Sequence, residues 1–486
     1  MVYDRFRNLD AVLLANVRRF CTYFFQLRFE MRYVGILLVI CSFPVFMSLL
    51  RSGPIAQKWA FIVLGAAPVI GTALNTDAAF ISWAHWPGHT KGIIISLTDT
   101  LALAICVHFR PRSKYPLLFW FWVFYIICNV PGLLLGSLFT PGLFYLVSLL
   151  KAALYFLAYY IVMSRGAMSA LVSGLCIAVI ANSGMTISNF LQGVGQPGGL
   201  VGHRNYAGLI NNLAIPLLLV DGTFGRLKLW RLLAIGMAAV AAILGGSRAV
   251  IVLFGASVYL TLFCALVARP SKQIKYMLAM CVLASFLAVP AGLQKLRDRS
   301  EDGSIMLSKD AERTAFEKAA QMMIKDHPLG IGLNQYANLA NVGGYSAAAG
   351  VNWMSASKSA IVHNSYVLVR TEGGLIAQFA MLLLLASTLV TSTKRAFKPT
   401  ASPARVFAVP ALVATLILSI HLSFEWAFVT MNNLYSFALI TALASFVTDV
   451  AQKDIIRKGR DRALIRSEHI ASALIRGSCR PNTKSP

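Results

Sequence analysis

Residues 116–139 read PLLFWFWVFYIICNVPGLLLGSLF, an apolar run without a charged side chain. About twenty such residues cross the hydrocarbon core of a bilayer as a helix. Similar runs recur along the 486-residue chain, which is 57% hydrophobic and only 13% charged, with mean hydropathy +0.67. A soluble domain needs more polar surface, and the alternating pattern of a membrane β-barrel is missing. The sequence therefore predicts an all-α, polytopic helical membrane protein.

Thirteen candidate membrane segments stand out by their hydropathy, and the lysine and arginine clusters between them indicate the orientation, because short cytoplasmic loops are enriched in these residues. An odd number of spans with a cytoplasmic C-terminus would place the basic N-terminus outside, against the same rule. We therefore expect about twelve transmembrane helices with both ends in the cytoplasm. The candidate segments are 31–50, 56–75, 93–109, 116–139, 142–163, 167–190, 204–221, 232–246, 248–268, 275–292, 363–391, 404–422 and 429–449.

This topology divides the chain into five parts. Residues 1–30 are basic and intermittently apolar, which predicts an amphipathic segment on the cytoplasmic surface. Residues 31–292 form an N-terminal transmembrane bundle, and residues 363–449 form the C-terminal transmembrane helices. Between them, residues 293–362 make one large loop, or lid, on the outer face. Residues 450–486 are predicted to be a basic cytoplasmic tail.

The large loop carries the pattern of one helix. Phe316, Ala319 and Met323 recur at helical spacing, and Pro328 sets the end of this helix, because a residue before proline avoids the helical region. Residues 338–359 are rich in Gly, Ala, Ser and Asn, a composition typical of a mobile lid.

The net charge of +25 fits a protein whose partners are anionic membrane lipids. The basic residues are spread over many short loops, so nucleic-acid binding is not expected. None of the eight cysteines forms a CxxC pair, which indicates small core residues rather than disulfides or metal ligands.

The candidate catalytic residue is His363. The run His363-Asn364-Ser365-Tyr366 lies where the longest polar stretch of the chain meets a long apolar segment, so an imidazole is expected at a membrane–water boundary. We predict that His363 begins a helix and that Arg370 lies about 10 Å further along the same face. The alternative is that His363 is a capping or interfacial residue without a catalytic role.

Several arginines are predicted on the outer face, where the topological rule expects few: Arg204, Arg248, Arg297, Arg299 and Arg313. The planar guanidinium matches phosphate oxygens in a bidentate manner, so a ligand that bears a pyrophosphate would account for the excess. The alternative for Arg204 and Arg248 is that each side chain reaches to lipid headgroups from the end of a helix.

Asp77, Asp99 and Glu425 are candidate ion-pair partners for these arginines. His85 and His89 stand near two tryptophans and indicate an interfacial aromatic belt. A metal pair at this i, i+4 spacing is disfavoured because a proline between them breaks a regular helix. No metal site is predicted.

At this point the motifs resemble a known family. His363-Asn364-x-Tyr366 followed by Glu372-x-Gly374-Leu375 resembles the His-Asn-x-Tyr…Glu-x-Gly-Leu signature of the bacterial O-antigen ligase and O-antigen polymerase superfamily. Arg313 followed by residues 326–332, Asp-His-Pro-Leu-Gly-Ile-Gly, is similar to its outer-loop Arg…Pro-x-x-Gly-x-Gly pattern. The resemblance covers roughly residues 200–450 and is most specific over 299–377.

Two shorter matches and two departures accompany this signature. Residues 202–207, Gly-His-Arg-Asn-Tyr-Ala, resemble the Asn-x-x-Ala start of a span in that family, and Ser247-Arg248 resembles its Ser-Arg pair. Ala377 replaces a usual glycine, and Arg370 occupies a usually apolar position, which puts the helix packing around the signature in doubt.

The resemblance implies a metal-independent, inverting glycosyl transfer without a cofactor. The donor would be a glycan on undecaprenyl pyrophosphate, and the acceptor a sugar hydroxyl of lipid A–core or of a growing polysaccharide. The site would face the periplasm, in a multi-pass protein of the bacterial inner membrane. His363 would be the base, and Arg248, Arg313 and Arg204 would bind the pyrophosphate. The expected supporting residues are Asn364, Tyr366, Glu372, Asn205 and Glu425.

Other functions stay open at this stage. A polymerase of the same superfamily shares the signature and differs in its acceptor, and a transferase onto protein is a further enzyme. A polysaccharide flippase or transporter is the alternative from a different class. It predicts ionisable residues near the bilayer midplane and an internal repeat. The polar groups gather instead at one face, which favours the enzyme.

Overall fold

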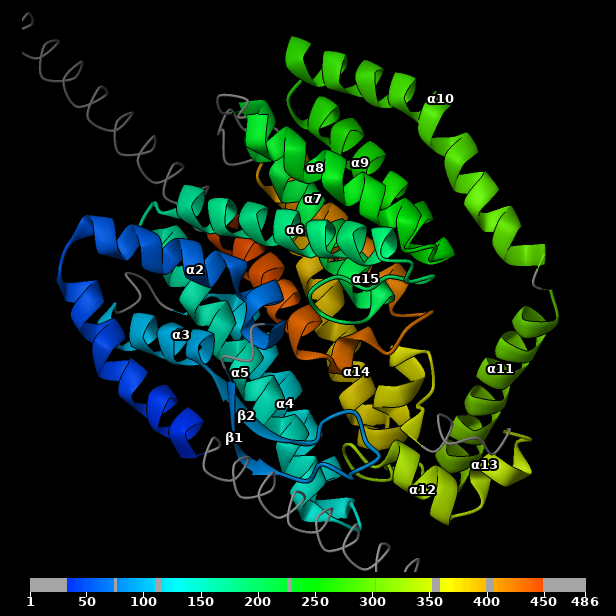
Figure 1. Cartoon of the computed structure of the whole chain (residues 1–486). Helices are drawn as coiled ribbons and strands as arrows, with labels where there is room; N and C mark the ends of the chain where they lie inside the picture. Colours follow the sequence, from blue (N-terminus) through cyan, green and yellow to red (C-terminus); the bar gives the residue numbers. More distant parts are fainter. Residues whose placement is uncertain are drawn as a thin grey trace, which may run out of the picture.

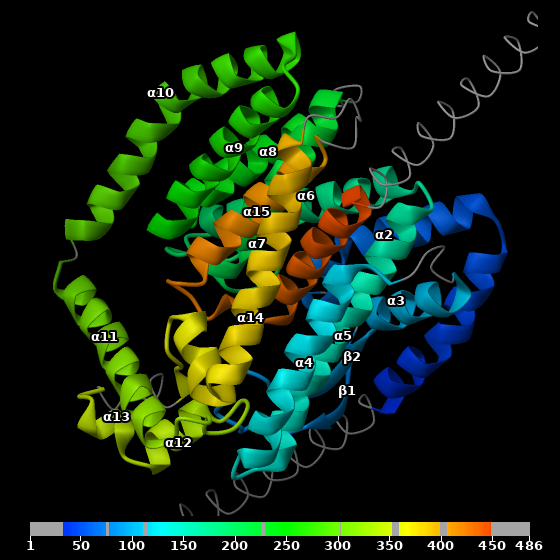
Figure 2. The same cartoon turned by 180° about the vertical axis from the view of Figure 1, so that it is seen from behind.

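The computed structural model describes residues 33–73, 77–109, 115–224, 229–301, 303–351, 359–398 and 406–448, and these residues are almost entirely helical (Figures 1 and 2). The predicted N-terminal segment 1–30 and the predicted tail 450–486 lie outside the described residues.

The helices of the N-terminal part occupy the left and the centre of Figure 1. The first of them, Tyr33–Arg51, carries no label there. It is followed by α2 (Pro54–Ala73), α3 (Leu97–His108), α4 (Leu117–Leu135), α5 (Phe139–Ser164) and α6 (Met168–Leu191).

The second part of the chain completes the bundle and adds a long arm. Figure 1 shows α10 and α11 as an arm at the right-hand edge of the molecule. The elements are α7 (Arg204–Phe224), α8 (Leu229–Leu244), α9 (Arg248–Ala268), α10 (Lys272–Glu301), α11 (Gly303–Asp326), α12 (Tyr336–Val342), α13 (Tyr345–Ala348), α14 (Ser365–Phe397), α15 (Ala408–His421), the 3-10 helix η3 (Ala427–Val429) and a last helix at Met431–Thr448.

Eight helices in the described part of the chain are long and apolar enough to cross a membrane. Three shorter apolar helices, α3, α8 and α15, accompany them. The structure thus supports the expected helical protein with several membrane-length segments, while the number of about twelve spans stays a prediction. The eight are Tyr33–Arg51, Pro54–Gly71, Leu117–Leu135, Phe139–Ser164, Met168–Leu191, Arg248–Ala268, Ser365–Phe397 and Met431–Thr448.

One departure from an all-helical chain is a small antiparallel hairpin. β1 (Asp77–Ser82) pairs with β2 (Gly92–Ser96), with Ser82 opposite Gly92. The sequence indicated only an outer-face loop over residues 76–92. Ser96 ends the hairpin and begins α3, because its hydroxyl accepts the Asp99 amide while the Asp99 carboxylate accepts the Ser96 amide, a reciprocal capping box.

Two glycines let α2 and α6 cross in direct backbone contact. A Cβ atom at Gly174 would lie 1.8 Å from the Ile62 carbonyl oxygen, and one at Gly65 would lie 2.1 Å from the Leu171 carbonyl oxygen. Small residues at such crossings are the usual means by which helices pack tightly in a membrane. The pair therefore sets how the N-terminal helices meet.

The segment predicted as an outer loop is largely helical. α10 continues to Glu301, past the predicted boundary at 292, and α11 ends at Asp326 as the proline predicts. α12 and α13 lie within the segment predicted as a lid, of which residues 352–358 fall outside the described part.

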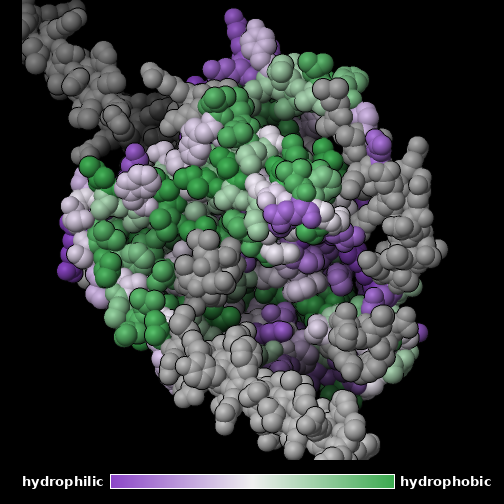
Figure 3. Space-filling model, in the orientation of Figure 1, coloured by the Kyte–Doolittle hydropathy of each residue, from purple (hydrophilic) through white to green (hydrophobic). Residues whose placement is uncertain are grey.

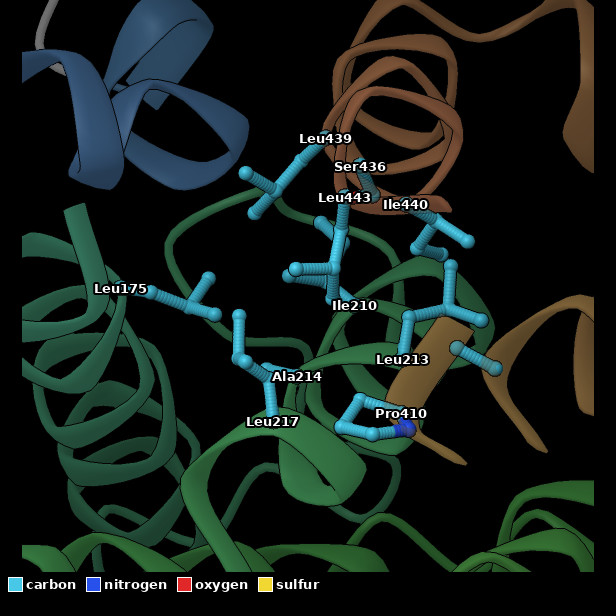
Figure 4. Close-up of a pocket in the computed structure, with 11 residues that line it drawn as sticks. Leu175, Ile210, Leu213, Ala214, Leu217, Pro410, Ser436, Leu439, Ile440 and Leu443 are labelled. Atoms are coloured by element: carbon cyan, nitrogen blue, oxygen red, sulfur yellow. The ribbon is translucent and has the colours of Figure 1, made fainter. Parts of the chain in front are cut away.

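The interior between α6, α7, α15 and the last helix is apolar. Figure 4 shows leucine and isoleucine side chains of these helices pointing into a narrow cavity beside Pro410. On the surface, hydrophobic side chains cover much of the left-hand part of Figure 3, and hydrophilic ones gather right of its centre. This polar area lies where Figure 1 shows the loop before α7 and the loop after α15.

The α2–α6 crossing can be tested by adding one methyl group. We expect Gly174→Ala to lower the thermal unfolding temperature of the purified protein strongly, because the new Cβ has no room against the Ile62 carbonyl. Gly255→Ala in α9 is the matched control, since its Cβ would meet no atom within 4 Å. That control should be neutral or slightly stabilising. Equal effects of the two substitutions would contradict the crossing.

Candidate functional site

His363 lies just before α14 rather than in its first turn. The helix begins at Ser365, and Asn364 caps it, because the Asn364 side-chain oxygen accepts the amides of Tyr366 and Val367 at 3.1 and 3.2 Å. The expectation that His363 begins the helix and shares a face with Arg370 is therefore wrong. Asn364 has an extended backbone, so the helix does not continue back to His363.

α11 contributes the ring that faces His363. The Phe316 and His363 ring centroids are 6.4 Å apart, and Phe316 itself is buried. The helix predicted inside the large loop thus packs near the candidate base, although the two residues are far apart in sequence. His363 is half-buried, and its Nδ1 atom makes no hydrogen bond with any described residue.

The surroundings of His363 favour a neutral imidazole. Burial lowers the pKa of His363 to about 4, and the positive charge of Arg313 and the neighbouring His203 act in the same direction. A hydrogen bond with the Ile361 backbone opposes them weakly. The same causes, burial first and then the charges of Arg204 and Arg313, lower the pKa of His203. Near neutral pH the His363 imidazole is thus uncharged.

Glu425, in the loop after α15, is the acidic group of the site. Its side chain is 4% exposed, and the Arg313 Nη2 atom lies 3.4 Å from its Oε1 atom. The Asn205 side chain donates to the same oxygen. Burial raises the pKa of Glu425 to about 7, although Arg313, Asn205 and Arg204 each act to lower it. The arginine pairing expected for Glu425 is thus present.

The loop that carries Glu425 is bound to the start of α14. The Ser365 hydroxyl donates to the Glu425 carbonyl at 2.6 Å, and the Ser365 amide donates to the Leu422 carbonyl at 2.8 Å. The Tyr366 hydroxyl donates to the Ser419 carbonyl at 2.7 Å. These three bonds, made by Ser365 and Tyr366, hold the end of α15 against the start of α14.

The three predicted phosphate-binding arginines differ in their placement. Arg313 joins the cluster directly, and its side chain is 46% exposed. Arg204 begins α7 and lines a small cavity together with Asn211 and Ser247. Arg248 begins α9 next to Ser247 and is exposed. Arg204 acts on Glu425 and His203 through its charge, so it belongs to the same electrostatic environment.

Glu372 belongs to a second cluster, whose contacts hold separate segments of the chain together. Its Oε2 atom accepts the Asn334 amide at 2.8 Å and lies 3.1 Å from the His89 Nε2 atom, and its Oε1 atom accepts the Tyr336 amide at 3.0 Å. The Glu372 side chain is 3% exposed and that of His89 is 1% exposed. A buried carboxylate with three donors fastens the turn after α11 to α14.

The reading of His89 as part of an interfacial belt is therefore wrong. His89 is a buried partner of Glu372, and its ring packs edge-on against Tyr145 at 5.0 Å. The neighbouring Trp86 is buried as well and donates to the Asn334 carbonyl at 3.0 Å. His85 is exposed. Glu372, an ionisable residue inside an apolar segment, was the signal that could have indicated a buried partner.

The Pro-x-x-Gly-x-Gly stretch lies directly on a break in α14. Gly374 has φ 76° and ψ −173°, which divides α14 into two helical pieces. The Ile331 and Gly332 amides donate to the Thr371 and Glu372 carbonyls at 2.9 and 3.0 Å. A Cβ atom at Gly330, where φ is 101°, would lie 2.7 Å from the Glu372 carbonyl oxygen. Only glycine fits both its conformation and this contact.

Arg370 pairs across the same break. Its Nη1 atom donates to the Gln378 side-chain oxygen at 3.2 Å, and Gln378 donates to the Tyr366 carbonyl at 3.4 Å. The unusual arginine thus bridges the two pieces of α14. Ala377 is fully buried there, so the two departures from the family pattern both lie at the kink.

A buried ion pair lies in the N-terminal bundle. The Lys151 Nζ atom of α5 is 2.6 Å from the Asp99 Oδ2 atom, and the Tyr435 hydroxyl donates to Asp99 Oδ1 at 2.7 Å. Asp99 thus pairs with a lysine, and the expectation that its partner is an arginine is wrong. Lys151, a charge inside an apolar segment, was the signal that could have revealed this pair. The Asp77 side chain lies outside the described part.

Metal ligation receives no support from the side chains that the structure describes. Among them, no group of three or more His, Cys, Asp or Glu residues gathers as a metal site would require. The six cysteines in the described ranges are free, and Cys41 is exposed rather than part of the core.

Comparison with known proteins adds no relative. No protein-family model matches this chain, and no curated protein matches it in sequence. The fold defines a helical membrane protein, and the site must be interpreted from its own residues.

The Glu372 cluster can be tested by removing its carboxylate. We expect Glu372→Ala to destabilise the folded protein by roughly 2–4 kcal/mol, because two buried amides and the His89 ring would lose their acceptor. Thermal unfolding of the purified protein in detergent measures this effect. Glu317→Ala, at an exposed position of α11, is the matched control. Equal unfolding temperatures for the two variants would show that Glu372 does not fasten the turn.

Proposed function

We propose that this protein is a metal-independent, inverting glycosyltransferase of the O-antigen ligase type. It moves a glycan from undecaprenyl pyrophosphate to a sugar hydroxyl of lipid A–core or of a growing polysaccharide, at the periplasmic face of the bacterial inner membrane. The observation that carries the proposal is that Arg313 of α11, which is half-exposed and bonded to Glu425, acts through its charge on the half-buried, neutral His363 just before α14. The imidazole suits a proton acceptor, and the guanidinium suits a phosphate ligand.

His363 accepts the proton of the acceptor hydroxyl. As that proton moves to an imidazole nitrogen, the hydroxyl oxygen forms a bond to the anomeric carbon of the donor glycan. The bond from this carbon to the pyrophosphate oxygen breaks, and its electron pair leaves with undecaprenyl pyrophosphate. Attack from the opposite face inverts the anomeric configuration. A general base of this kind contributes roughly 10²–10⁴-fold to a rate.

Arg313 stabilises the leaving group. The pyrophosphate gains negative charge as the glycosidic bond breaks, and a guanidinium placed for it stabilises that charge. Arg313 shares its charge with Glu425, whose pKa of about 7 leaves much of this carboxyl protonated near neutral pH. The arginine is therefore not fully neutralised by its partner. Arg204 adds positive potential to the same region, and Arg248 is assigned to the donor on the resemblance.

The bound donor also adjusts the base. In the empty site, burial and Arg313 hold the pKa of His363 at about 4, which is low for a base that works near neutral pH. A pyrophosphate beside Arg313 brings negative charge close to the imidazole, and negative charge raises the pKa of a histidine. The base thus reaches its working strength only when the donor is present.

A polymerase of the same superfamily uses the same residues, with a lipid-linked glycan as acceptor, and a transferase onto protein would differ in its acceptor alone. Analysis of the glycan products in cells that lack this protein distinguishes the three enzymes. Loss of glycan-capped lipid A–core with polymer still made identifies a ligase, and a product of single repeats identifies a polymerase. Glycan missing from a protein alone identifies a protein transferase.

One observation favours a transporter as the second candidate. Buried ionisable residues within membrane helices often mark a transport pathway, and Asp99 pairs with Lys151 inside the bundle. However, Asp99 also accepts the Ser96 amide and the Tyr435 hydroxyl, bonds that fit a packing lock. Flipping of a fluorescent lipid-linked glycan by reconstituted protein, without any transfer product, would favour the transporter.

His363→Gln tests the assignment of the base. We expect at least about a 100-fold loss of glycan transfer by the purified protein, because glutamine cannot take the hydroxyl proton. The matched control is His85→Gln, at an exposed position of the hairpin loop, which should retain wild-type activity. Size-exclusion chromatography checks that both variants are folded. Transfer by His363→Gln within a few-fold of wild type would exclude His363 as the base.

The pH dependence tests the coupling between Arg313 and His363. Because Arg313 lowers the pKa of His363, Arg313→Gln should raise that pKa. The acidic limb of kcat/KM, where the imidazole becomes protonated, should then move to higher pH. Lys318→Gln, also exposed on α11, is the control and should leave the limb in place. An unmoved or lowered limb in Arg313→Gln would contradict the coupling.

A further inference from the structure

A basic cavity lies at the end of α14 opposite to His363. It has a volume of about 680 Å³, and three cations line it: Lys394, Arg395 and Lys398. Thr391, Thr393 and Thr448 line it as well, and the hydroxyls of Thr393 and Thr448 donate to the Leu389 and Ala444 carbonyls of their own helices. Thr448 comes from the last helix, so two helices build the walls. None of the described residues that line the cavity is acidic. Cations and hydroxyls without a carboxylate are the donors that bind a phosphate group.

An exposed apolar stripe leads along α14 to this cavity. Its members are between 38% and 58% exposed: Leu375, Phe379, Leu382, Val390 and Phe397. Their spacing places them on one face of the helix. Phe397, the last of them, lines the cavity itself. The apolar face and the phosphate-binding donors are therefore continuous.

The length of the stripe indicates where the cavity lies. From Leu375 to Phe397 the helix rises about 33 Å at 1.5 Å per residue. This rise is close to the ~30 Å thickness of the hydrocarbon core. The kink at Gly374 then marks one boundary of the core, and Lys394, Arg395 and Lys398 mark the other. At such a boundary the phosphate of a phospholipid is available, with its acyl chains directed into the core.

We propose that this cavity binds the headgroup of an anionic phospholipid. The headgroup phosphate contacts the three cations and the Thr391 hydroxyl, and an acyl chain lies along the exposed stripe of α14. Since Thr448 lines the cavity from the last helix, the bound lipid lies between α14 and that helix. The site is separate from His363, Arg313 and Glu425, and it does not depend on the glycosyl transfer.

Native mass spectrometry of the purified protein with added phosphatidylglycerol or phosphatidylcholine tests this site. We expect wild type to retain phosphatidylglycerol preferentially, and the triple variant K394Q/R395Q/K398Q to bind it at least about tenfold more weakly. Each cation near an anionic lipid contributes roughly a fivefold change in affinity. The control R269Q/K272Q/K275Q removes three charges from the α9–α10 junction, at the same end of the molecule as the C-terminal end of α14 (Figure 2). It should change the affinity by less than about threefold.

A second variant keeps the test independent of net charge and of folding. T391V removes the Thr391 hydroxyl from the cavity with little change of shape and should also weaken phosphatidylglycerol binding. Equal losses in the two triple variants would mean general surface charge and would overturn the proposal. So would unchanged binding by T391V, or inorganic phosphate that binds as tightly as the lipid, which would assign the cavity to a free anion.

Discussion

The Glu372 carboxylate is the constraint on which the arrangement of the candidate site depends. A buried charge is tolerated only when it is paired and hydrogen-bonded, and Glu372 satisfies this with the amides of Asn334 and Tyr336 and with the ring of His89. These donors come from the turn after α11 and from the loop between β1 and β2. One side chain of α14 therefore joins this helix to the turn after α11 and to the loop between β1 and β2, which are distant from each other in the sequence. The turn that it holds follows α11, the helix that carries Arg313.

The kink at Gly374 follows from the same arrangement. A regular helix bonds its own carbonyls, yet the Thr371 and Glu372 carbonyls accept the amides of Ile331 and Gly332. The left-handed conformation of Gly374 frees them for this, and glycine adopts it at little cost. The break separates a membrane-length helical piece from a short piece that begins after His363 and Asn364. The long piece of α14 and the short piece beside the candidate site thus meet at one residue.

Part of this could be predicted from the sequence. The polar–apolar boundary at His363 and the end of α11 before Pro328 are local features, and the structure has both. The start of α14 was misplaced because the apolar period was given more weight than the capping signal of Asn364. The His89–Glu372 pair is separated by 283 positions, so no local pattern contains it. The Gly373-Gly374 pair is equally compatible with an unbroken helix, and the kink appears only through the turn that packs on it.

The two titratable groups of the site have opposite relations to Arg313. Burial moves both toward their neutral forms, lowering the pKa of His363 to about 4 and raising that of Glu425 to about 7. The guanidinium reinforces the first shift and opposes the second, because it repels an imidazolium and attracts a carboxylate. An anionic ligand at Arg313 would reverse both influences at once, making His363 more basic and Glu425 easier to protonate. Arg313 would then be released from Glu425 to the ligand as the base gains strength. A site of this design couples ligand binding to proton affinity through a single cation.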